Sequence, residues 1–587
     1  MTAGGPAVHW SADAEVSPPD LFDWCLALGL VLLMFALETY VAVGIGRSQS
    51  LAYDGLGYAA HARTKYFQLQ TLLRDPWNYL GGFLHYIAPL WSVFIVGTYL
   101  IADIGEIQAS LALFWPILFL LLLVIWTVRL LADRTLATLL ALFTAALPLA
   151  SPNLALVVTY QLGFDWLGYM QTNLADPRPD LLGYVFMLWS VVLLLLKGRD
   201  AGRATFIMSA VMASLSALTK TTTAPLTLGC WGLAILYVVW LRRDRLRETA
   251  VSALPAAAIL GLLLAPWVAA GGLRLVLNYI RDAYAWKPFY DRSATEAGLH
   301  HFAFHRYILG AHLHFSWPVI GLMVGVAALA IACNRGRSPR PRTLLAGLGL
   351  AAIWILIPLY VEKLRNHVLA LPLYLTLWLL FAAAASDLWR RYGSPQIRTA
   401  VAGSLALGIA ATACTGLAGV RAWPQEDLRR LLRGRDLIRE IAGDVALYLT
   451  SRDTFAGLVL ASGWPMILQF HMTRDASGHP ASFRFWPPDG PAIAGDAAAR
   501  QRFIADLETQ AKLIVTFKEP PEQVYRQARM SDFFLPHFNA LHEYLNSGRS
   551  RYRPVREYVF PPPGRFFFPP AAGTVVMYLR DDVPSRF

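Results

Sequence analysis

Long apolar stretches alternate with short polar segments over the first 423 residues of this 587-residue chain. Each stretch is close to the roughly 20 residues that an α-helix needs to cross a bilayer. Eleven stretches predict spans, at about 21–44, 109–131, 135–151, 181–197, 205–220, 224–241, 250–270, 313–333, 343–361, 367–386 and 399–420. A further stretch, 77–102, contains Gly81, Gly82, His85 and Pro89, which favour a broken or interfacial helix. The pattern predicts a polytopic α-helical membrane protein with about 11 spans, in a range of 11 to 13.

Composition narrows the class of protein in the same direction. Hydrophobic residues make up 56% of the chain and charged residues only 15%, whereas a soluble domain is about 25% charged. This balance excludes a soluble globular enzyme, a disordered protein and a secreted disulfide scaffold. All four cysteines lie in apolar runs without metal-binding spacing, so we expect no disulfide framework. The net charge of +12 is attributed to basic residues in the cytoplasmic loops of a membrane protein, so no nucleic-acid partner is expected.

The arginine-rich loops predict which side of the membrane each segment occupies. Four loops are basic, at about 197–203, 241–248, 335–342 and 390–398, and the positive-inside rule places them in the cytoplasm. The intervening segments 152–180, 221–223, 271–312 and 362–366 then face outward, as does the chain after 421.

The first span gives conflicting signals. Residues 1–23 carry no Lys or Arg, while the loop after the span carries Arg47, Arg63, Lys65 and Arg74. Charge alone therefore places 45–76 inside and makes 77–102 a true span. The opposite topology leaves 45–108 outside, with 77–102 as a juxtamembrane helix. The N-terminus lacks a basic n-region, so we expect an uncleaved anchor rather than a signal peptide.

Residues 424–587 have a different composition, rich in Arg, Asp, Pro and aromatics. Strand-like runs are predicted at Val445–Leu449, Leu458–Ala461, Lys512–Phe517 and Thr574–Leu579, and helices at about 426–441, 497–509 and 521–545. This region is predicted to be a small α/β domain outside the membrane.

The outward loops combine carboxylates with cations. Cations at a membrane surface can hold the phosphate of a lipid, and a carboxylate can take a proton from an incoming nucleophile. Together these functions describe glycosyl transfer from a polyprenyl-phosphate sugar. The residues involved are Asp54, Tyr58, His61, Arg63 and Lys65 in the first loop, then Asp165, Asp176, Arg178, Asp180, Lys220, Lys287, Glu362, Lys363, Arg365 and His367.

Four of these segments resemble the GT-C-fold glycosyltransferases of the protein-mannosyltransferase and lipid A aminoarabinose-transferase kind. Asp54 through Tyr58 is similar to the Asp-x-x-x-Tyr stretch after the first span of that family. The family also has an acidic residue that opens a later span, a Leu-Thr-Lys stretch, and a basic turn before a Pro-containing span. The corresponding segments here are Arg178–Leu182, Ala217–Lys220 and Glu362–His367. Two departures are that Gly55, not a second acid, follows Asp54, and that His367 stands where an aromatic is common.

The resemblance implies a fold, a topology and a set of roles. It implies eleven spans and three parts of the chain: a cytoplasmic segment, 1–20, a GT-C-like transmembrane domain, 21–423, and a periplasmic α/β domain, 424–587. The catalytic outward loops of the transmembrane domain are implied to be 45–108, 152–180, 271–312 and 362–366. Asp54 is implied to be the general base of an inverting transfer, with Tyr58 orienting it. Asp180 is implied to orient a sugar hydroxyl or a lysine. The other residues implied to bind substrate are Arg63, Lys220, Lys287, Lys363, Arg365 and His367.

Each assignment has a structural alternative. Asp54 and Asp180 are also suited to cap helices, and Lys220, Lys363 and Arg365 to anchor span ends at the headgroups. His301 and His305 share a helix face if that segment is helical, but no third ligand is evident. We therefore expect no metal site, although a divalent metal ion is left open.

Two other functions compete, a flippase for a lipid-linked saccharide and a non-catalytic assembly protein. A flippase explains the spans but explains the C-terminal domain less well, and it predicts a pair of Gly/Pro-broken spans in matching halves that the sequence does not show. A non-catalytic assembly protein leaves the ordered set of Asp54, Asp180, Lys220 and Arg365 unexplained. The expected partners are the lipid bilayer, a polyprenyl-phosphate-linked sugar, and a glycan, lipid or protein acceptor. The expected location is a bacterial inner membrane, with the site on the periplasmic face. The sugar, the acceptor and the oligomeric state stay open.

Overall fold

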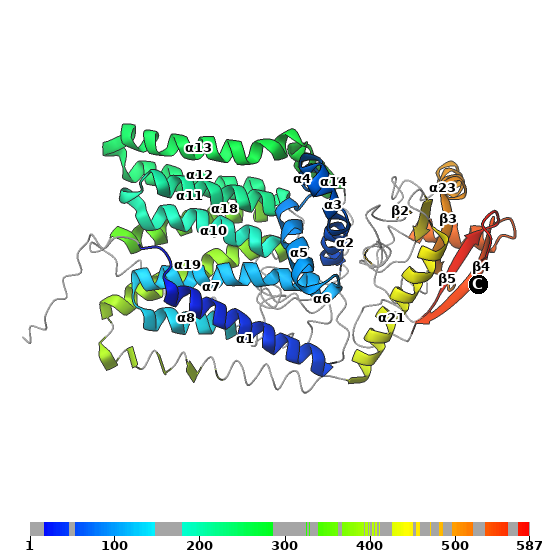
Figure 1. Ribbon diagram of the computed structural model, residues 1–587, viewed down its shortest axis with the longest axis horizontal. Helices are drawn as coiled ribbons and strands as arrows, with labels where there is room; N and C mark the ends of the chain where they lie inside the picture. Colours follow the sequence, from blue (N-terminus) through cyan, green and yellow to red (C-terminus); the bar gives the residue numbers. More distant parts are fainter. Residues whose placement is uncertain are drawn as a thin grey trace, which may run out of the picture.

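The computed structural model joins an apolar helical bundle to a mixed β-sheet flanked by helices (Figure 1). It describes residues 17–45, 53–146, 179–285, 339–361 and 367–392 of the apolar part, with isolated positions between 325 and 410. After residue 424 it describes 425–449, 453–457, 481–484, 496–520, 535–560 and 573–585, together with Phe470.

Nine of the predicted spans coincide with helices of the bundle. These are α1 (Leu21–Ile45), α7 (Phe114–Leu131), α8 (Arg134–Ala146), α10 (Asp180–Lys197), α11 (Arg203–Thr219), α12 (Ala224–Leu241), α13 (Leu246–Ala269), α18 (Pro339–Val361) and α19 (His367–Tyr392). The predicted spans 313–333 and 399–420 lie outside the described residues, apart from isolated positions. Five described segments are long and apolar enough to cross a membrane: Gln108–Leu131, Asp180–Asp200, Thr221–Leu241, Arg243–Ala269 and Leu371–Tyr392. The chain is therefore a polytopic helical membrane protein.

The bundle has a central helix and a lipid-facing one. In α10, 16 of the 18 residues are buried, so this helix is enclosed by its neighbours on all sides. In α13 only Thr249, Ala256, Leu264 and Trp267 are buried, while Leu254 and Leu262 are each 74% exposed. A helix that is apolar all round but packed on one side only suits a bilayer.

The arginine-rich segments gather at one end of the bundle, which we call the basic end (left in Figure 1). Arg199 donates to the carbonyl of Leu241 at 2.9 Å, joining the loops on either side of α11 and α12. The indole of Trp389 near the end of α19 donates to Asp133, between α7 and α8, at 2.7 Å. The predicted grouping of the basic loops on one side is therefore present in the packing.

The stretch 77–102 does not cross the bundle. It is divided into α4 (Pro76–Leu84) and α5 (Pro89–Ala102), preceded by α2 (Tyr53–Phe67) and α3 (Leu69–Arg74) and followed by α6 (Glu106–Ser110). The 14 residues of α5 extend only about 21 Å, short of a bilayer core of about 30 Å. At the start of α7, the Phe114 ring lies 6.1 Å from that of Phe35 in α1, and the Trp115 ring lies 5.8 Å from that of Phe94 in α5, measured between centroids. Helices α2 to α6 thus all lie at the end opposite the basic end, which we call the site end (Figure 1).

The residues after 424 form a five-stranded sheet of order β2-β1-β3-β5-β4, with flanking helices. The strands are β1 (Asp453–Gly457), β2 (Ala481–Arg484), β3 (Ala511–Phe517), β4 (Tyr552–Phe560) and β5 (Gly573–Arg580), and the helices are α21 (Gln425–Tyr448), α23 (Ala497–Gln510) and α25 (Leu535–Asn546). Strand β1 is parallel to β2 and β3, whereas β5 is antiparallel to β3 and β4. The Tyr558 hydroxyl donates to Asp444 at 2.7 Å and thereby fixes α21 to β4. Burial, and then this hydrogen bond, raise the pKa of Tyr558.

Some expectations for this region are confirmed and others are wrong. The strands at 512–517 and 574–579 and the helices at 426–441 and 497–509 are confirmed. Val445–Leu449 was expected as a strand, but α21 continues to Tyr448, because Ile441, Val445 and Tyr448 bury a helical face. Of the helix expected at 521–545, only α25 is described. Leu458–Ala461 lies outside the described residues.

Three strands were not predicted, and β4 shows why. Its alternation of exposed and buried residues is interrupted by charges and by Pro554. Pro554 lies at a register shift in its pairing with β5, on an edge strand that tolerates a missing N–H donor.

The contact between α12 and α18 gives a test of the bundle. A Cβ at Gly229 would lie 2.2 Å from Trp354 Nε1, so Gly229→Ala must push a rigid indole. We expect a loss of about 1–3 kcal/mol of stability, seen as a lower thermal unfolding midpoint in detergent. Gly232→Ala is the matched control on the same helix, because a Cβ there meets nothing within 4 Å. Equal midpoints for the two variants would contradict this packing.

Candidate functional site

A buried ion pair marks the site end of the bundle. Asp180 is the first residue of α10, and Lys220 directly follows α11, so two antiparallel helices bring them together. Lys220 Nζ lies 2.6 Å from Asp180 Oδ1. The side chains of Asp180 and Lys220 are only 1% and 12% exposed. The ammonium of Lys220 is therefore held against the carboxylate of Asp180.

Small polar residues allow the helices that carry this pair to approach closely. The hydroxyl of Ser216 on α11 donates to the carbonyl of Gly183 on α10 at 2.6 Å. The same hydroxyl lies 2.8 Å from the hydroxyl of Thr227 on α12. A Cβ at Gly183 would contact Thr223 at 3.5 Å, so the three helix ends are in van der Waals contact. This packing holds the ion pair in a fixed place.

Two buried polar atoms, one in the pair and one in the residue that follows Lys220, have no hydrogen-bond partner among the described residues. They are Asp180 Oδ2 and Thr221 Oγ1. Both residues are almost fully buried, at 1% and 0% exposure. Burying a polar atom without a partner is costly, so such atoms often serve a function. Asp180 Oδ2 is thus a free acceptor on the carboxylate that holds the ammonium, and Thr221 contributes a hydroxyl from the residue after Lys220.

A main-chain hydrogen bond joins this pair to the segment between α4 and α5. The amide of Thr221 donates to the carbonyl of Ile87 at 2.8 Å. The neighbouring Tyr86 ring stacks on His61 of α2, with centroids 3.7 Å apart and planes 7° apart. Tyr58 packs edge-on against the same ring at 6.0 Å. Helix α2 and the Asp180–Lys220 pair are therefore linked through residues 86 and 87.

Helix α2 begins at Tyr53, which places Asp54 in its first turn rather than at its N-cap. The side chain of Asp54 lies outside what the structure describes. At 3.6 residues per turn, position 54 belongs to the same helical face as Tyr58, His61 and Lys65. That face packs against residues 79–92.

Two cations of α2 have different surroundings. Arg63 Nη1 donates to the carbonyl of Phe470 at 3.0 Å, and its guanidinium lies 5.0 Å from the centre of the Phe470 ring. Lys65 Nζ donates to Gln68 Oε1 at 3.2 Å and lies 5.6 Å from the centre of the Phe83 ring. Burial lowers the pKa of Lys65. Arg63 thus contacts the chain beyond the bundle, and Lys65 the juxtamembrane segment.

The structure does not describe the side chains of the remaining predicted residues. Lys287, Lys363 and Arg365 lie outside the described residues, as do Asp165, Asp176 and Arg178. His367 is the first residue of α19, and its side chain is not described. Within the described ranges, no three His, Cys, Asp or Glu side chains are grouped around a common point as metal ligands would be.

Sequence reasoning missed Tyr86, Ile87 and Thr221 as parts of this site. Tyr86 and Ile87 belong to the stretch whose topology was open, and Ile87 acts only through its carbonyl. Thr221 follows the predicted Lys220 directly, so its proximity was available from the sequence. A hydroxyl without a partner is visible only in the folded chain.

Comparison with known proteins identifies the fold. No family model matches the sequence, and no curated protein matches it. The chain resembles the solved structure of ArnT from Cupriavidus metallidurans bound to undecaprenyl phosphate, with 16% identity, a TM-score of 0.52, and coverage of 95% of this chain and 99% of that chain. The apo state of ArnT gives 16% identity, a TM-score of 0.51 and the same coverage of 95% and 99%. The chain therefore has the GT-C fold, which confirms the fold implied by the resemblance.

The ion pair can be tested by a double-mutant cycle. Lys220→Ala leaves the Asp180 carboxylate buried and unpaired, and Asp180→Ala leaves the ammonium unpaired. Breaking a buried pair in this way costs about 3–5 kcal/mol. We expect each single variant to lower the thermal midpoint more than the double variant does.

The surface pair Asp436–Arg439, with side chains 50% and 30% exposed, is the control. Asp436→Ala should change the midpoint little, because exposed pairs contribute about 0–1 kcal/mol. Additive effects of Asp180→Ala and Lys220→Ala would contradict a coupled pair.

Proposed function

We propose that the protein is an inverting glycosyltransferase that moves a sugar from a polyprenyl-phosphate donor to an acceptor at the outer face of the membrane. The observation that carries the proposal is the buried Asp180–Lys220 pair at the site end. One oxygen of its carboxylate has no hydrogen-bond partner among the described residues, and α2, which carries Asp54, is linked to the residue after Lys220 through Tyr86 and Ile87.

The fold supports a lipid-linked donor. ArnT, whose fold the chain shares, has been solved with undecaprenyl phosphate bound. A polyprenyl phosphate keeps its tail in the bilayer and needs only a polar site at the end of a bundle for its head. The site end offers such a place, because it lies where the apolar helices terminate.

In the proposed reaction, Asp54 is the general base. Its carboxylate takes the proton of the acceptor hydroxyl as that oxygen attacks the anomeric carbon. The bond between this carbon and the phosphate oxygen breaks, and the electron pair leaves with the polyprenyl phosphate. A single displacement of this kind inverts the configuration at the sugar. Tyr58, one turn further along α2, is proposed to help position the base.

Lys220 is proposed to stabilise the leaving phosphate. Its ammonium is held at 2.6 Å by Asp180, so it is oriented before the donor arrives, and charge stabilisation by preorganised groups is strong in a dry site. The second carboxylate oxygen of Asp180 is proposed to accept a hydrogen bond from a sugar hydroxyl. Lys363, Arg365, Lys287 and His367 complete the proposed phosphate and donor contacts.

The described contacts of Arg63 favour a different role from phosphate binding. Its guanidinium is engaged with Phe470 and Phe67, so we propose that it holds the chain beyond the bundle against α2. The basic loops are proposed to be cytoplasmic and the site end periplasmic, in a bacterial inner membrane.

The general base is tested with Asp54→Asn. The assay offers a panel of undecaprenyl-phosphate sugars to membranes containing the protein and detects released undecaprenyl phosphate by mass spectrometry. General-base catalysis contributes typically 10²–10⁴-fold, so we expect release to fall by at least about 100-fold while undecaprenyl phosphate still binds.

Asp75→Asn is the matched control. Asp75 is exposed and caps α4 by accepting from the amide of Asn78 at 3.1 Å, and Asn caps as well as Asp does. Unchanged release by Asp54→Asn would remove the base from the mechanism. An absence of release from every sugar by the unaltered protein would favour transport of a lipid-linked saccharide.

The side of the membrane is a separate prediction. A single cysteine at Gly55, in an otherwise Cys-free chain, should react with an impermeant maleimide in spheroplasts, because α2 lies at the end opposite the basic loops. Protection in spheroplasts, with reaction only after lysis, would place α2 in the cytoplasm and exclude a periplasmic base.

A further inference from the structure

The orientation of α1 contradicts the charges that flank it. Basic residues within about 20 residues of a span normally stay in the cytoplasm, and acidic residues contribute little to this preference. Residues 1–20 contain no Lys or Arg, whereas Arg47, Arg63 and Lys65 follow α1 within that distance. Flanking charge therefore directs the start of α1 away from the basic loops. In the structure the start of α1 lies at the basic end (Figure 1).

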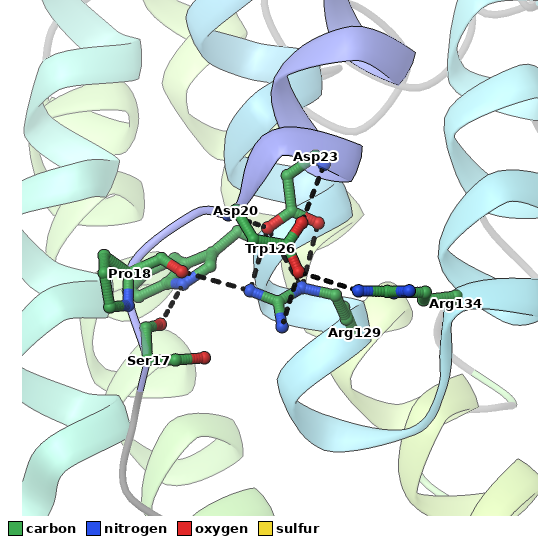
Figure 2. Close-up of polar contacts among 7 residues, drawn as sticks. All are labelled: Ser17, Pro18, Asp20, Asp23, Trp126, Arg129 and Arg134. Atoms are coloured by element: carbon green, nitrogen blue, oxygen red, sulfur yellow. Dashed lines mark hydrogen bonds and ion pairs between the residues drawn. The ribbon is translucent and has the colours of Figure 1, made fainter.

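An ion-pair network holds the start of α1 at the basic end (Figure 2). Arg129, in the last turn of α7, contacts Asp23 with two nitrogens, Nε at 2.9 Å and Nη2 at 2.8 Å. Arg134, at the start of α8, contacts Asp20 at 2.9 Å. The backbone of the same segment also takes part, because the carbonyl of Pro18 accepts from Arg129 Nη2 at 3.2 Å.

The pair at the centre of the network, Asp23 with Arg129, is buried. Asp23 is 0% exposed and Arg129 is 14% exposed, so each is the neutralising partner of the other. Trp126 extends the contact by donating from its indole to the carbonyl of Ser17 at 2.9 Å. With α1 inverted, Asp23 would lie at the site end and Arg129 would remain buried without a carboxylate. The arrangement is therefore available in only one orientation of α1.

We propose that the ion pairs of Asp20 and Asp23 with Arg129 and Arg134 determine the membrane orientation of α1, in place of the basic residues that are missing from its N-terminal flank. The orientation is then fixed when α1 docks on α7 and α8, rather than by its own flanking charge. Because α2 follows α1, the same contact decides on which side α2 lies. The inference concerns topology and does not depend on the proposed enzymatic function.

The test measures the side of the N-terminus in the full chain. A single cysteine replaces Gly5 in a form in which all four native cysteines are serine, and spheroplasts are treated with an impermeant maleimide. The cysteine should be protected in the otherwise unaltered chain. With Arg129→Gln and Arg134→Gln together, we expect at least half of the molecules to be labelled.

Two matched variants separate this effect from simple loss of charge or of folding. Arg243→Gln with Arg245→Gln removes the same charge from exposed residues of the basic end that form no ion pair among the described residues, and should leave the cysteine protected. Ala3→Lys with Ala7→Lys, added to the Arg129 and Arg134 changes, supplies the missing N-terminal charge and should restore protection.

Protection that persists without Arg129 and Arg134 would overturn the proposal, as would equal labelling in the Arg243 and Arg245 variant. If the chain lacking Arg129 and Arg134 fails to accumulate, its recovery decides the question. Accumulation restored by the two lysines supports an orientation defect, and accumulation not restored by them overturns it.

Discussion

The apolar interior of a bilayer tolerates few unpaired charges, and the architecture of this protein follows from that constraint. Charged groups lie toward the two ends of the bundle, and a buried ion pair is present at each end. Asp23 with Arg129 occupies the basic end, and Asp180 with Lys220 the site end. Between them, α10 is enclosed on all sides while α13 presents leucines outward. The site end combines the held ammonium of Lys220 with a carboxylate oxygen of Asp180 that has no hydrogen-bond partner among the described residues.

Much of the bundle was accessible from the sequence, because its helices coincide with apolar runs whose length the bilayer sets. The stretch 77–102 was ambiguous, because its apolar content resembles a span while its glycines and Pro89 do not. Its place is decided by tertiary contacts of Phe94 and Ile87, which no local pattern encodes. Strand β4 was missed for a related reason, since an edge position accommodates Pro554 and charges that a central strand would exclude.

The sequence indicated which residues belong to the candidate site better than it indicated which of them contact one another. Asp180 and Lys220 were found because acidic and basic residues at span ends are conspicuous in an apolar chain. Their pairing depends on the antiparallel packing of α10 and α11 across a glycine and a serine. The aromatic stack of His61 on Tyr86 was not foreseen, because it joins residues 25 positions apart through a segment of uncertain topology. Arg63 was expected at a phosphate, but its described contacts lie with Phe470 and Phe67, in the chain beyond the bundle and on α2 itself.

The hydrogen bond from Thr221 to Ile87 joins main chain to main chain. Its donor and acceptor are present in every amino acid except for the missing N–H of proline. The hydrogen bond that links the juxtamembrane segment to the ion pair therefore does not depend on the side chains at positions 87 and 221. Sequences can diverge widely at residues 87 and 221 while the two halves of the site stay in register. The residues that hold this site together need therefore leave no trace in a sequence motif, which is how a fold of this kind can persist where sequence similarity has faded.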